Sequence, residues 1–213
     1  MARTQSADYD QRRELITRQA ARLYAQKGFL GASIADISVA CHMSKSLIYH
    51  YFPSKEDILF AVMWSHVSIL AEAARMIAAL NRAPEDKLRW LAHTLMGEYQ
   101  GAQDAHKILL NELDNLPEGK RAVIVHAERQ LLDLLDTLLV ALRPHLRLMP
   151  KQRRPIVMMF FGMLNWTHTW YNTQGPVSAE KIAALAADMW LTGLPRPTQT
   201  AKPKSQKIDN PQF

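Results

Sequence analysis

One short segment near the amino end of the chain gathers side chains that can donate hydrogen bonds: Lys45, Ser46, Tyr49 and His50. Leu47, Ile48 and Phe52 lie between them at helical spacing, and Ser44 stands where a helix N-cap belongs. The pattern therefore predicts a short helix with an apolar back and a donor-rich front. The major groove of DNA accepts a helix of this kind, because base edges there present hydrogen-bond acceptors.

A second short helix is expected just before it. Ser33 can act as its N-cap, and Asp36 three residues later makes a weak capping box. Ile34, Ile37 and Ala40 recur at helical spacing. Two short helices joined by a tight turn, with another helix covering their backs, form a helix-turn-helix unit. We expect this DNA-binding domain to occupy residues 1–55.

The segment from Gly28 to Leu59 resembles the DNA-binding domain of the TetR (tetracycline-repressor) family of transcriptional regulators. The resemblance covers roughly the first 60 residues. It rests on the pattern G-x4-S-I-x2-I-x2-A-x3-S-x3-IY-x-YF-x-SKE-x-IL. The matching positions are Gly28, Ser33, Ile37, Ala40, Ser44, Tyr49, Phe52, Lys55 and Leu59.

The chain departs from the family pattern at two places. Ser33 stands where the family usually has Thr, which also caps a helix. Cys41 and His42 replace a small pair, often Ala-Gly. Because the family glycine serves a turn with positive φ, we expect His42 to adopt a conformation that histidine tolerates less well.

The resemblance implies which residues contact DNA. Tyr49 and Lys55 match family positions that touch phosphates, while Lys45 can donate to guanine and Leu47 can meet a thymine methyl group. A phosphate would also relieve the unfavourable position of Lys55 near a helix N-terminus. The expected DNA-binding set is Ser33, Ser44, Lys45, Ser46, Leu47, Tyr49, His50, Tyr51 and Lys55.

The remaining sequence predicts an all-α protein. Apolar residues recur with helical period almost throughout, and Pro84, Pro117 and Pro144 mark breaks between helices. We expect a larger ligand-binding and dimerisation domain at residues 56–195, with the basic segment MPKQRRP linking two of its helices. Residues 196–213, rich in proline and polar side chains, are expected to form a disordered basic tail.

The last two helices are predicted to pair in a homodimer, as the resemblance implies. FFGMLNWTHTWY and AALAADMWLTGL combine aromatic residues with small ones that allow close helix packing. Since one helix-turn-helix unit contacts few base pairs, a dimer on a near-palindromic double-stranded operator is expected, with half-sites roughly 34 Å apart or more.

Residues 160–194 are also similar to the TetR subgroup that responds to acyl-coenzyme A thioesters. An acyl-CoA needs apolar surface for its chain, aromatic surface for adenine and cations for its phosphates. The expected effector-binding residues are Arg147, Arg153, Arg154, Met159, Trp166 and Trp170. The resulting hypothesis is a repressor that an acyl-CoA releases from its operator.

The composition and residue spacing indicate the cellular compartment and whether a metal or cofactor is expected. Charged residues make up 22% and apolar residues 48%, as in globular proteins, and the net charge is +6. The single cysteine, Cys41, fits a reducing cytoplasm, and neither a signal peptide nor a membrane span is expected. The spacing of histidine, cysteine and acidic residues suggests no metal site, and no cofactor is expected.

Three other interpretations remain open on the sequence. A TetR-type regulator of efflux would sense a cationic drug through buried acids, for which Glu98, Glu112, Asp114 and Glu128 are candidates. An architectural DNA-binding protein would need no second domain of this size. An enzyme such as a thioester hydrolase lacks support, because the chain contains no nucleophile elbow, phosphate-binding glycine loop or HExxH motif.

Overall fold

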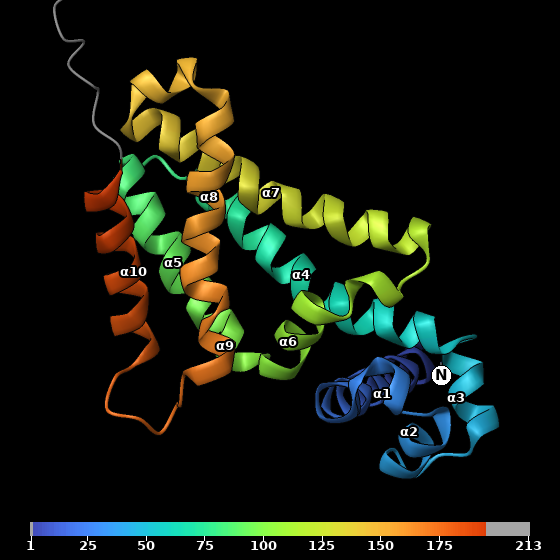
Figure 1. Ribbon diagram of the computed structural model, residues 1–213. Coiled ribbons are helices and arrows are strands. Elements are labelled where there is room, and N and C mark those ends of the chain that lie inside the picture. Colours follow the sequence, from blue (N-terminus) through green and yellow to red (C-terminus); the bar gives the residue numbers. More distant parts are fainter. Residues whose placement is uncertain (1, 195–213) are drawn as a thin grey trace, which may run out of the picture.

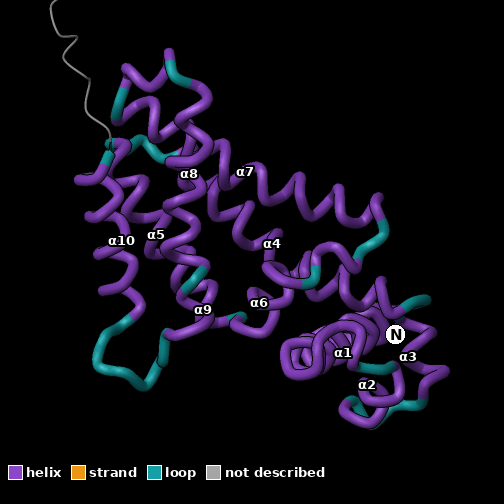
Figure 2. The backbone as a smooth tube through the Cα atoms, viewed as in Figure 1, coloured by secondary structure: helices purple, strands orange, loops and turns teal. Residues whose placement is uncertain are grey.

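The computed structural model describes residues 2–194, with side chains described from residue 8 onward. Within these residues the chain is helical and contains no strand, which confirms the all-α prediction (Figures 1 and 2). The first helices are α1 (Ala2–Gly31), α2 (Ile34–Ala40), α3 (Lys45–Tyr51), α4 (Lys55–Ala79) and α5 (Pro84–Gly101). They are followed by α6 (Gln103–Asn111), η1 (Leu113–Asn115), α7 (Glu118–Leu142), η2 (Pro144–Leu148), α8 (Pro150–Asn165), α9 (Thr167–Trp170) and α10 (Ala179–Gly193). The predicted tail at residues 196–213 lies outside the described residues.

Helices α1, α2 and α3 form a small head at one end of the molecule (Figure 1). The predicted N-cap at Ser44 is confirmed, because its hydroxyl accepts the backbone N–H of Leu47 at 3.1 Å. Ser54 caps α4 in the same way, accepting the Asp57 N–H at 3.1 Å. Ser33 and Asp36 form a reciprocal capping box, with bonds of 3.1 and 2.8 Å. These caps fix where the short helices begin, and hence how α3 is presented.

The α2–α3 turn has the predicted backbone strain. His42 has φ of +53°, the left-handed region that favours glycine. Three backbone hydrogen bonds hold the turn, including Met43 N to Ser38 O at 2.9 Å. Because this turn sets the angle between α2 and α3, the strain is tolerated in a place that positions the exposed face of α3.

Replacing His42 with glycine is expected to stabilise the protein by about 0.5–1 kcal/mol. Relief of the left-handed conformation is worth about 1–2 kcal/mol, and the greater freedom of glycine in the unfolded chain removes about 0.4–1 kcal/mol of that. Urea denaturation followed by circular dichroism measures the difference. His42→Ala is the control, since alanine keeps the strain; equal stability of the two variants would contradict the explanation.

The other positive-φ residue, Gly28, lies inside α1 at φ of +74°. One more helical turn follows the kink before α1 ends at Gly31. Ala32 N donates to Gly28 O at 3.2 Å, which closes this extra turn. The kink redirects the chain toward α2 and places Phe29 between the head and the body.

The remaining helices form a larger body (Figure 1). Helix α4 runs as one continuous helix from the head into the body, where it packs against α5, α6 and α7. Helix α10 packs mainly along α5 and also contacts α8, which itself packs on α7. The most buried large side chains, such as Phe52, Ile58, Met63, Leu91 and Phe160, run from head to body in one core.

Helix α4 owes its apolar composition to this central place. By length and composition alone it is long and apolar enough to cross a membrane, yet half of its most apolar window is buried inside the protein. Its buried residues include Leu59, Met63 and Leu70. A helix that contacts four neighbours, α1, α5, α6 and α7, needs apolar residues on several faces.

The basic segment MPKQRRP was predicted to be a link, and this is wrong. Pro150 begins α8, and the helix continues through Pro155. Proline fits the first helical position, where its missing N–H costs nothing. Packing of α8 on α7, with Arg153 Nε 3.2 Å from Asp136 Oδ1, accounts for the continued helix despite the lost hydrogen bond at Pro155.

Candidate DNA-binding surface and effector cavity

Helix α3 presents the predicted polar face to solvent. Lys45, Ser46, Tyr49 and His50 are exposed, whereas Ile48 on the opposite side is fully buried. Ser44 Oγ lies 2.9 Å from Ser46 Oγ, so the cap and the exposed face share one hydroxyl pair. The arrangement leaves an ammonium, a hydroxyl, a phenol and an imidazole free to meet a ligand from one side.

Two other predicted residues serve the local structure as well. Leu47 is half-buried and packs against the core, so only part of its side chain faces outward. The exposed Ser33 uses its hydroxyl to donate to Asp36 Oδ2 at 2.6 Å and to accept the Asp36 N–H. Hydrogen bonds from Ser33, and then from Lys27, hold the pKa of Asp36 below its ordinary value. The capping box therefore remains charged at neutral pH.

The prediction that Tyr51 faces DNA is wrong. Only 7% of Tyr51 is exposed, and its ring packs on Tyr9 with centroids 4.8 Å apart. Residue 51 lies three positions after the buried Ile48, so helical periodicity turns both to the same inner side. The exposed face of α3 ends at His50.

Lys55 lies in a different environment from the one predicted. Its ammonium donates to the carbonyl oxygen of Phe29 and lies 4.2 Å from the centroid of the Phe29 ring. Partial burial lowers the pKa of Lys55 from its ordinary value. In this structure Lys55 joins the start of α4 to the end of α1, so its first role is to hold the head together.

Arg13 contacts the end of α3, a contact that was not predicted from the sequence. Its guanidinium donates to the carbonyl of Tyr51 at 3.1 Å and lies 4.3 Å from the centroid of Phe52. A cation at the C-terminus of α3 complements the partial negative charge of the helix end. The sequence gives no local signal for this contact, because the two partners are 38 residues apart.

The body contains a cavity of about 220 Å³. Its lining comes from α4, α5, α6, α7 and α8 and is mostly apolar, with Val67, Leu109, Leu131 and Phe161 among the residues that form it. The polar members of the lining are Tyr99, His106, Glu128, Arg154 and Asn165. Such a cavity suits an apolar ligand that carries a few polar groups.

Glu128 is the acid of this cavity, as the drug-sensor alternative requires. Burial raises the pKa of its carboxyl group above the ordinary value. The hydroxyl of Tyr99 donates to Asn165 Oδ1 at 2.9 Å, which ties α5 to α8 across the cavity. Tyr99 and His106 were not among the predicted ligand residues, since a lone aromatic or histidine within a helix gives no distinctive pattern.

Of the six residues predicted to bind the effector, Arg154 alone is among the residues that line this cavity. Arg153 is paired with Asp136, and Arg147 is exposed. Met159, Trp166 and Trp170 are 67%, 65% and 58% exposed, so the prediction that they enclose a ligand is wrong for this chain by itself. Met159 lies on α8, Trp170 ends α9, and Trp166 stands between these two helices.

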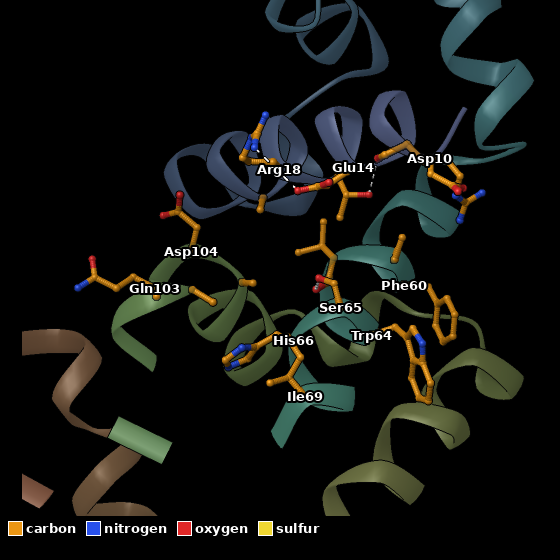
Figure 3. A pocket seen from close by; sticks show the side chains of 18 of the residues that line it. Asp10, Glu14, Arg18, Phe60, Trp64, Ser65, His66, Ile69, Gln103 and Asp104 are labelled. Carbon is orange, nitrogen blue, oxygen red and sulfur yellow. Dashed lines mark hydrogen bonds and ion pairs between the residues drawn. The ribbon is translucent and has the colours of Figure 1, made fainter. Parts of the chain in front are cut away.

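A larger groove of about 750 Å³ lies between the head and the body (Figure 3). Helix α1 forms one wall, α4 another, and the α5–α6 junction closes it. The rings of Phe60 and Trp64 stack at its edge with centroids 6.1 Å apart, and the opposite wall carries Glu14 and Arg18. His66 lines this groove from the α4 side.

Two side chains of the body contact the head, and a third contacts the start of α4. Lys107 on α6 donates to the carbonyl of Ala25 at 2.8 Å, and Glu112 accepts the Phe29 N–H at 3.1 Å. Lys120 on α7 donates to Asp57 at 2.7 Å. The first two contacts connect the helix that contributes His106 and Leu109 to the cavity directly with the end of α1.

The described residues contain no group of three or more His, Cys, Asp or Glu side chains arranged to hold a metal ion. The buried Cys41 stands alone.

Comparison with known proteins places both halves of the chain. The family model "Bacterial regulatory proteins, tetR family" matches residues 16–62, and "Tetracyclin repressor-like, C-terminal domain" matches residues 81–194. A TetR-family transcriptional regulator from Bordetella parapertussis 12822 is 35% identical, with a TM-score of 0.81 over 85% of this chain and 94% of that chain.

Two further proteins are similar. The structure of AibR in complex with isovaleryl coenzyme A and operator DNA has a TM-score of 0.73 at 26% identity, over 84% of this chain and 97% of that chain. The transcriptional repressor NicS of Pseudomonas putida is 31% identical over 114 residues, 53% of this chain and 52% of NicS. The chain spans less than two thirds of the length of the first curated relatives that it matches. From the two family models and the 35% identical structure together, the chain belongs to the TetR family of bacterial regulators, which are not enzymes.

Proposed function

We propose that this protein is a cytoplasmic transcriptional repressor that binds a near-palindromic operator as a homodimer and is released by a small-molecule effector. The observation that carries the proposal is the exposed donor face of α3, with Lys45, Ser46, Tyr49 and His50 over a buried apolar back. The caps at Ser33 and Ser44 and the contact from Arg13 fix this helix against the head. A rigid, donor-bearing helix is the element that reads base edges.

Replacing Lys45 with alanine tests the DNA half of the proposal. Lys45 begins α3, and recognition helices contact base edges with their N-terminal residues. We expect a 5- to 150-fold loss of operator affinity, corresponding to about 1–3 kcal/mol, together with relaxed preference at one base position. Selection from a random DNA library followed by electrophoretic mobility shift at fixed salt measures both effects.

The control for this experiment is Lys151→Ala, which removes an exposed cation in the first turn of α8. It should change operator affinity little, because residue 151 lies in the body. Equal losses on operator and random DNA for Lys45→Ala would show that Lys45 contacts only phosphates.

For the effector we propose a short-chain acyl-CoA thioester. AibR, similar over most of the chain, is described in complex with isovaleryl coenzyme A. The cavity of about 220 Å³ is somewhat larger than a 150 Å³ cavity that holds benzene, so it has room for an acyl group of about five to eight carbons. Arg154 offers one cation at its lining.

Release of the operator follows from the contacts between α6 and the head. A ligand in the cavity touches α6, and α6 carries Lys107 and leads to Glu112, which hold α1. A shift of α6 therefore changes how the two heads are spaced. By thermodynamic linkage, operator DNA must weaken effector binding by the same factor by which the effector weakens DNA binding.

A mobility-shift titration with isovaleryl-CoA, free isovalerate and CoA tests the effector class. Isovaleryl-CoA is expected to release the operator, whereas the free acid and CoA alone should do so poorly. Release by none of several acyl-CoA chain lengths would contradict this part of the proposal.

A cationic drug is the second candidate effector, and Glu128 is the observation that favours it. A half-buried carboxyl group that lines a mostly apolar cavity can pair with an organic cation. Berberine or ethidium added in the same titration would decide between the two classes, since release by such a cation and by no thioester identifies an efflux regulator.

A further inference from the structure

Two buried histidines meet between the groove and the inner cavity. His66 on α4 and His106 on α6 are each 2% exposed, and His66 Nε2 lies 3.1 Å from His106 Nδ1. The ring of Tyr99 stacks on His106, with centroids 3.7 Å apart. The sequence gives no motif for this pair, which is 40 residues apart.

The pair cannot satisfy all of its own nitrogens. One ring donates to the other across the 3.1 Å bond, and both outer nitrogens, His66 Nδ1 and His106 Nε2, have no hydrogen-bond partner. In either tautomer of the neutral pair, one outer nitrogen carries an unpaired N–H and the other an unpaired lone pair. Buried polar groups in native proteins nearly always have a partner, so this arrangement points to a missing one.

The pair is uncharged at neutral pH. Burial lowers the pKa of His66 to about 4, and burial together with the neighbouring His66 and His168 lowers the pKa of His106 to about 3. The rings that pack on the pair are those of Tyr99 and His168. The charged groups nearby are Glu128 and Arg154, which line the same cavity as His106, and Glu14 and Asp104, which line the groove with His66. A neutral imidazole N–H suits a neutral acceptor, because the uncharged pair supplies no positive charge to a carboxylate and Glu128 already lines the same cavity.

The position of the pair is suited to a ligand that reaches both hollows. His66 lines the open groove beside Trp64 and Ile69, as Figure 3 shows, while His106 lines the inner cavity. A molecule with an apolar end in the inner cavity and a longer polar arm toward the groove passes the two rings. In an acyl-CoA, the thioester carbonyl is the group that lies between these two parts.

We propose that the His66–His106 pair recognises the thioester carbonyl of the effector, with the spare imidazole N–H as the donor. This inference rests on the proposed acyl-CoA effector and adds the residues that distinguish a thioester from a thioether or a free carboxylate. The carbonyl oxygen accepts the N–H and satisfies a donor that is otherwise buried without a partner. A free carboxylate is disfavoured at the same place because the pair stays neutral.

The test compares isovaleryl-CoA with S-(3-methylbutyl)-CoA, a thioether that keeps the chain and the nucleotide and lacks only the carbonyl oxygen. Isothermal titration calorimetry on the wild-type protein is expected to show about 10- to 100-fold tighter binding of the thioester, as loss of a buried hydrogen-bond partner implies. Equal affinities for the two compounds overturn the assignment of the histidines and leave the proposed effector class standing. No binding of any acyl-CoA overturns both.

The double variant His66→Phe/His106→Phe, which keeps a ring beside Tyr99 and removes every nitrogen of the pair, should bind thioester and thioether equally. His126→Phe on the exposed side of α7 is the control and should keep the wild-type preference. A double variant that still prefers the thioester overturns the assignment. If that variant does not fold, the wild-type comparison of the two ligands decides by itself.

Discussion

Replacing Met159 with glutamate is expected to split the homodimer and to lower operator affinity by at least about 100-fold. The residue is 67% exposed on α8, and Trp166, which directly follows the last residue of α8, is 65% exposed. On the neighbouring α10, Leu185 and Met189 are 47% and 63% exposed at a spacing of four. Contiguous exposed apolar residues of this size on two packed helices indicate a surface that a partner covers.

A charge in that surface must be buried without a counterpart in both subunits, because a two-fold interface repeats each residue. Loss of the second head then removes the gain from linked half-sites, which is about 10²- to 10⁴-fold for linked binding events. Sedimentation velocity measures the dimer, and a mobility-shift titration measures operator affinity.

Met76→Glu is the matched control, because Met76 is 61% exposed on α4, away from α8 and α10. It should leave both the mass in solution and the operator affinity unchanged. A dimeric Met159→Glu protein with normal operator affinity would show that the subunits pair through some other surface.

Replacing Glu112 with alanine is expected to uncouple the effector from DNA. The carboxylate of Glu112 accepts the Phe29 N–H at 3.1 Å and the Asn115 amide at 2.6 Å, so it joins η1 to the kink after Gly28. Without it, movement of α6 reaches α1 through fewer contacts. The variant should still bind effector and operator, but the effector should weaken operator binding less than about fivefold, where typical coupling is about 5- to 150-fold.

Operator affinity with and without saturating isovaleryl-CoA, measured by fluorescence anisotropy, gives this coupling directly. Asp114→Ala is the control: its side chain is 98% exposed, and its ion pair with Arg121 stays within the body. Wild-type coupling in Glu112→Ala would mean that the signal passes elsewhere, for example through Lys120 and Asp57.

The head was predictable because its signals are local. The hydroxyls of Ser33 and Ser44 bond to backbone N–H groups three residues away. The positive φ at His42 was expected because His42 stands where the family has a glycine. Tyr51 was misplaced because the family pattern assigned it to the DNA side, whereas its position three residues after Ile48 requires burial. Spacing from a known buried residue was the better guide.

The effector cavity was not predictable to the same degree, because its lining is assembled from five helices. Tyr99, Glu128 and Asn165 come together only through the tertiary packing. The aromatic and methionine residues near the carboxyl end have a composition that suits either a ligand or a partner subunit. Their exposure favours the partner, and sequence spacing alone does not distinguish the two.

The continuity of α4 has a mechanical consequence. With 25 residues at 1.5 Å each, the helix is about 37 Å long, and it is held near its start by the Lys55 and Asp57 contacts. A tilt of about 5° at the cavity end of a rod this long displaces the other end by about 3 Å. In a symmetric dimer the α4 helices of both subunits tilt, so the displacements of the two heads add. A sub-ångström adjustment of side chains around a bound molecule thereby becomes a mismatch between the spacing of the heads and the pitch of the double helix.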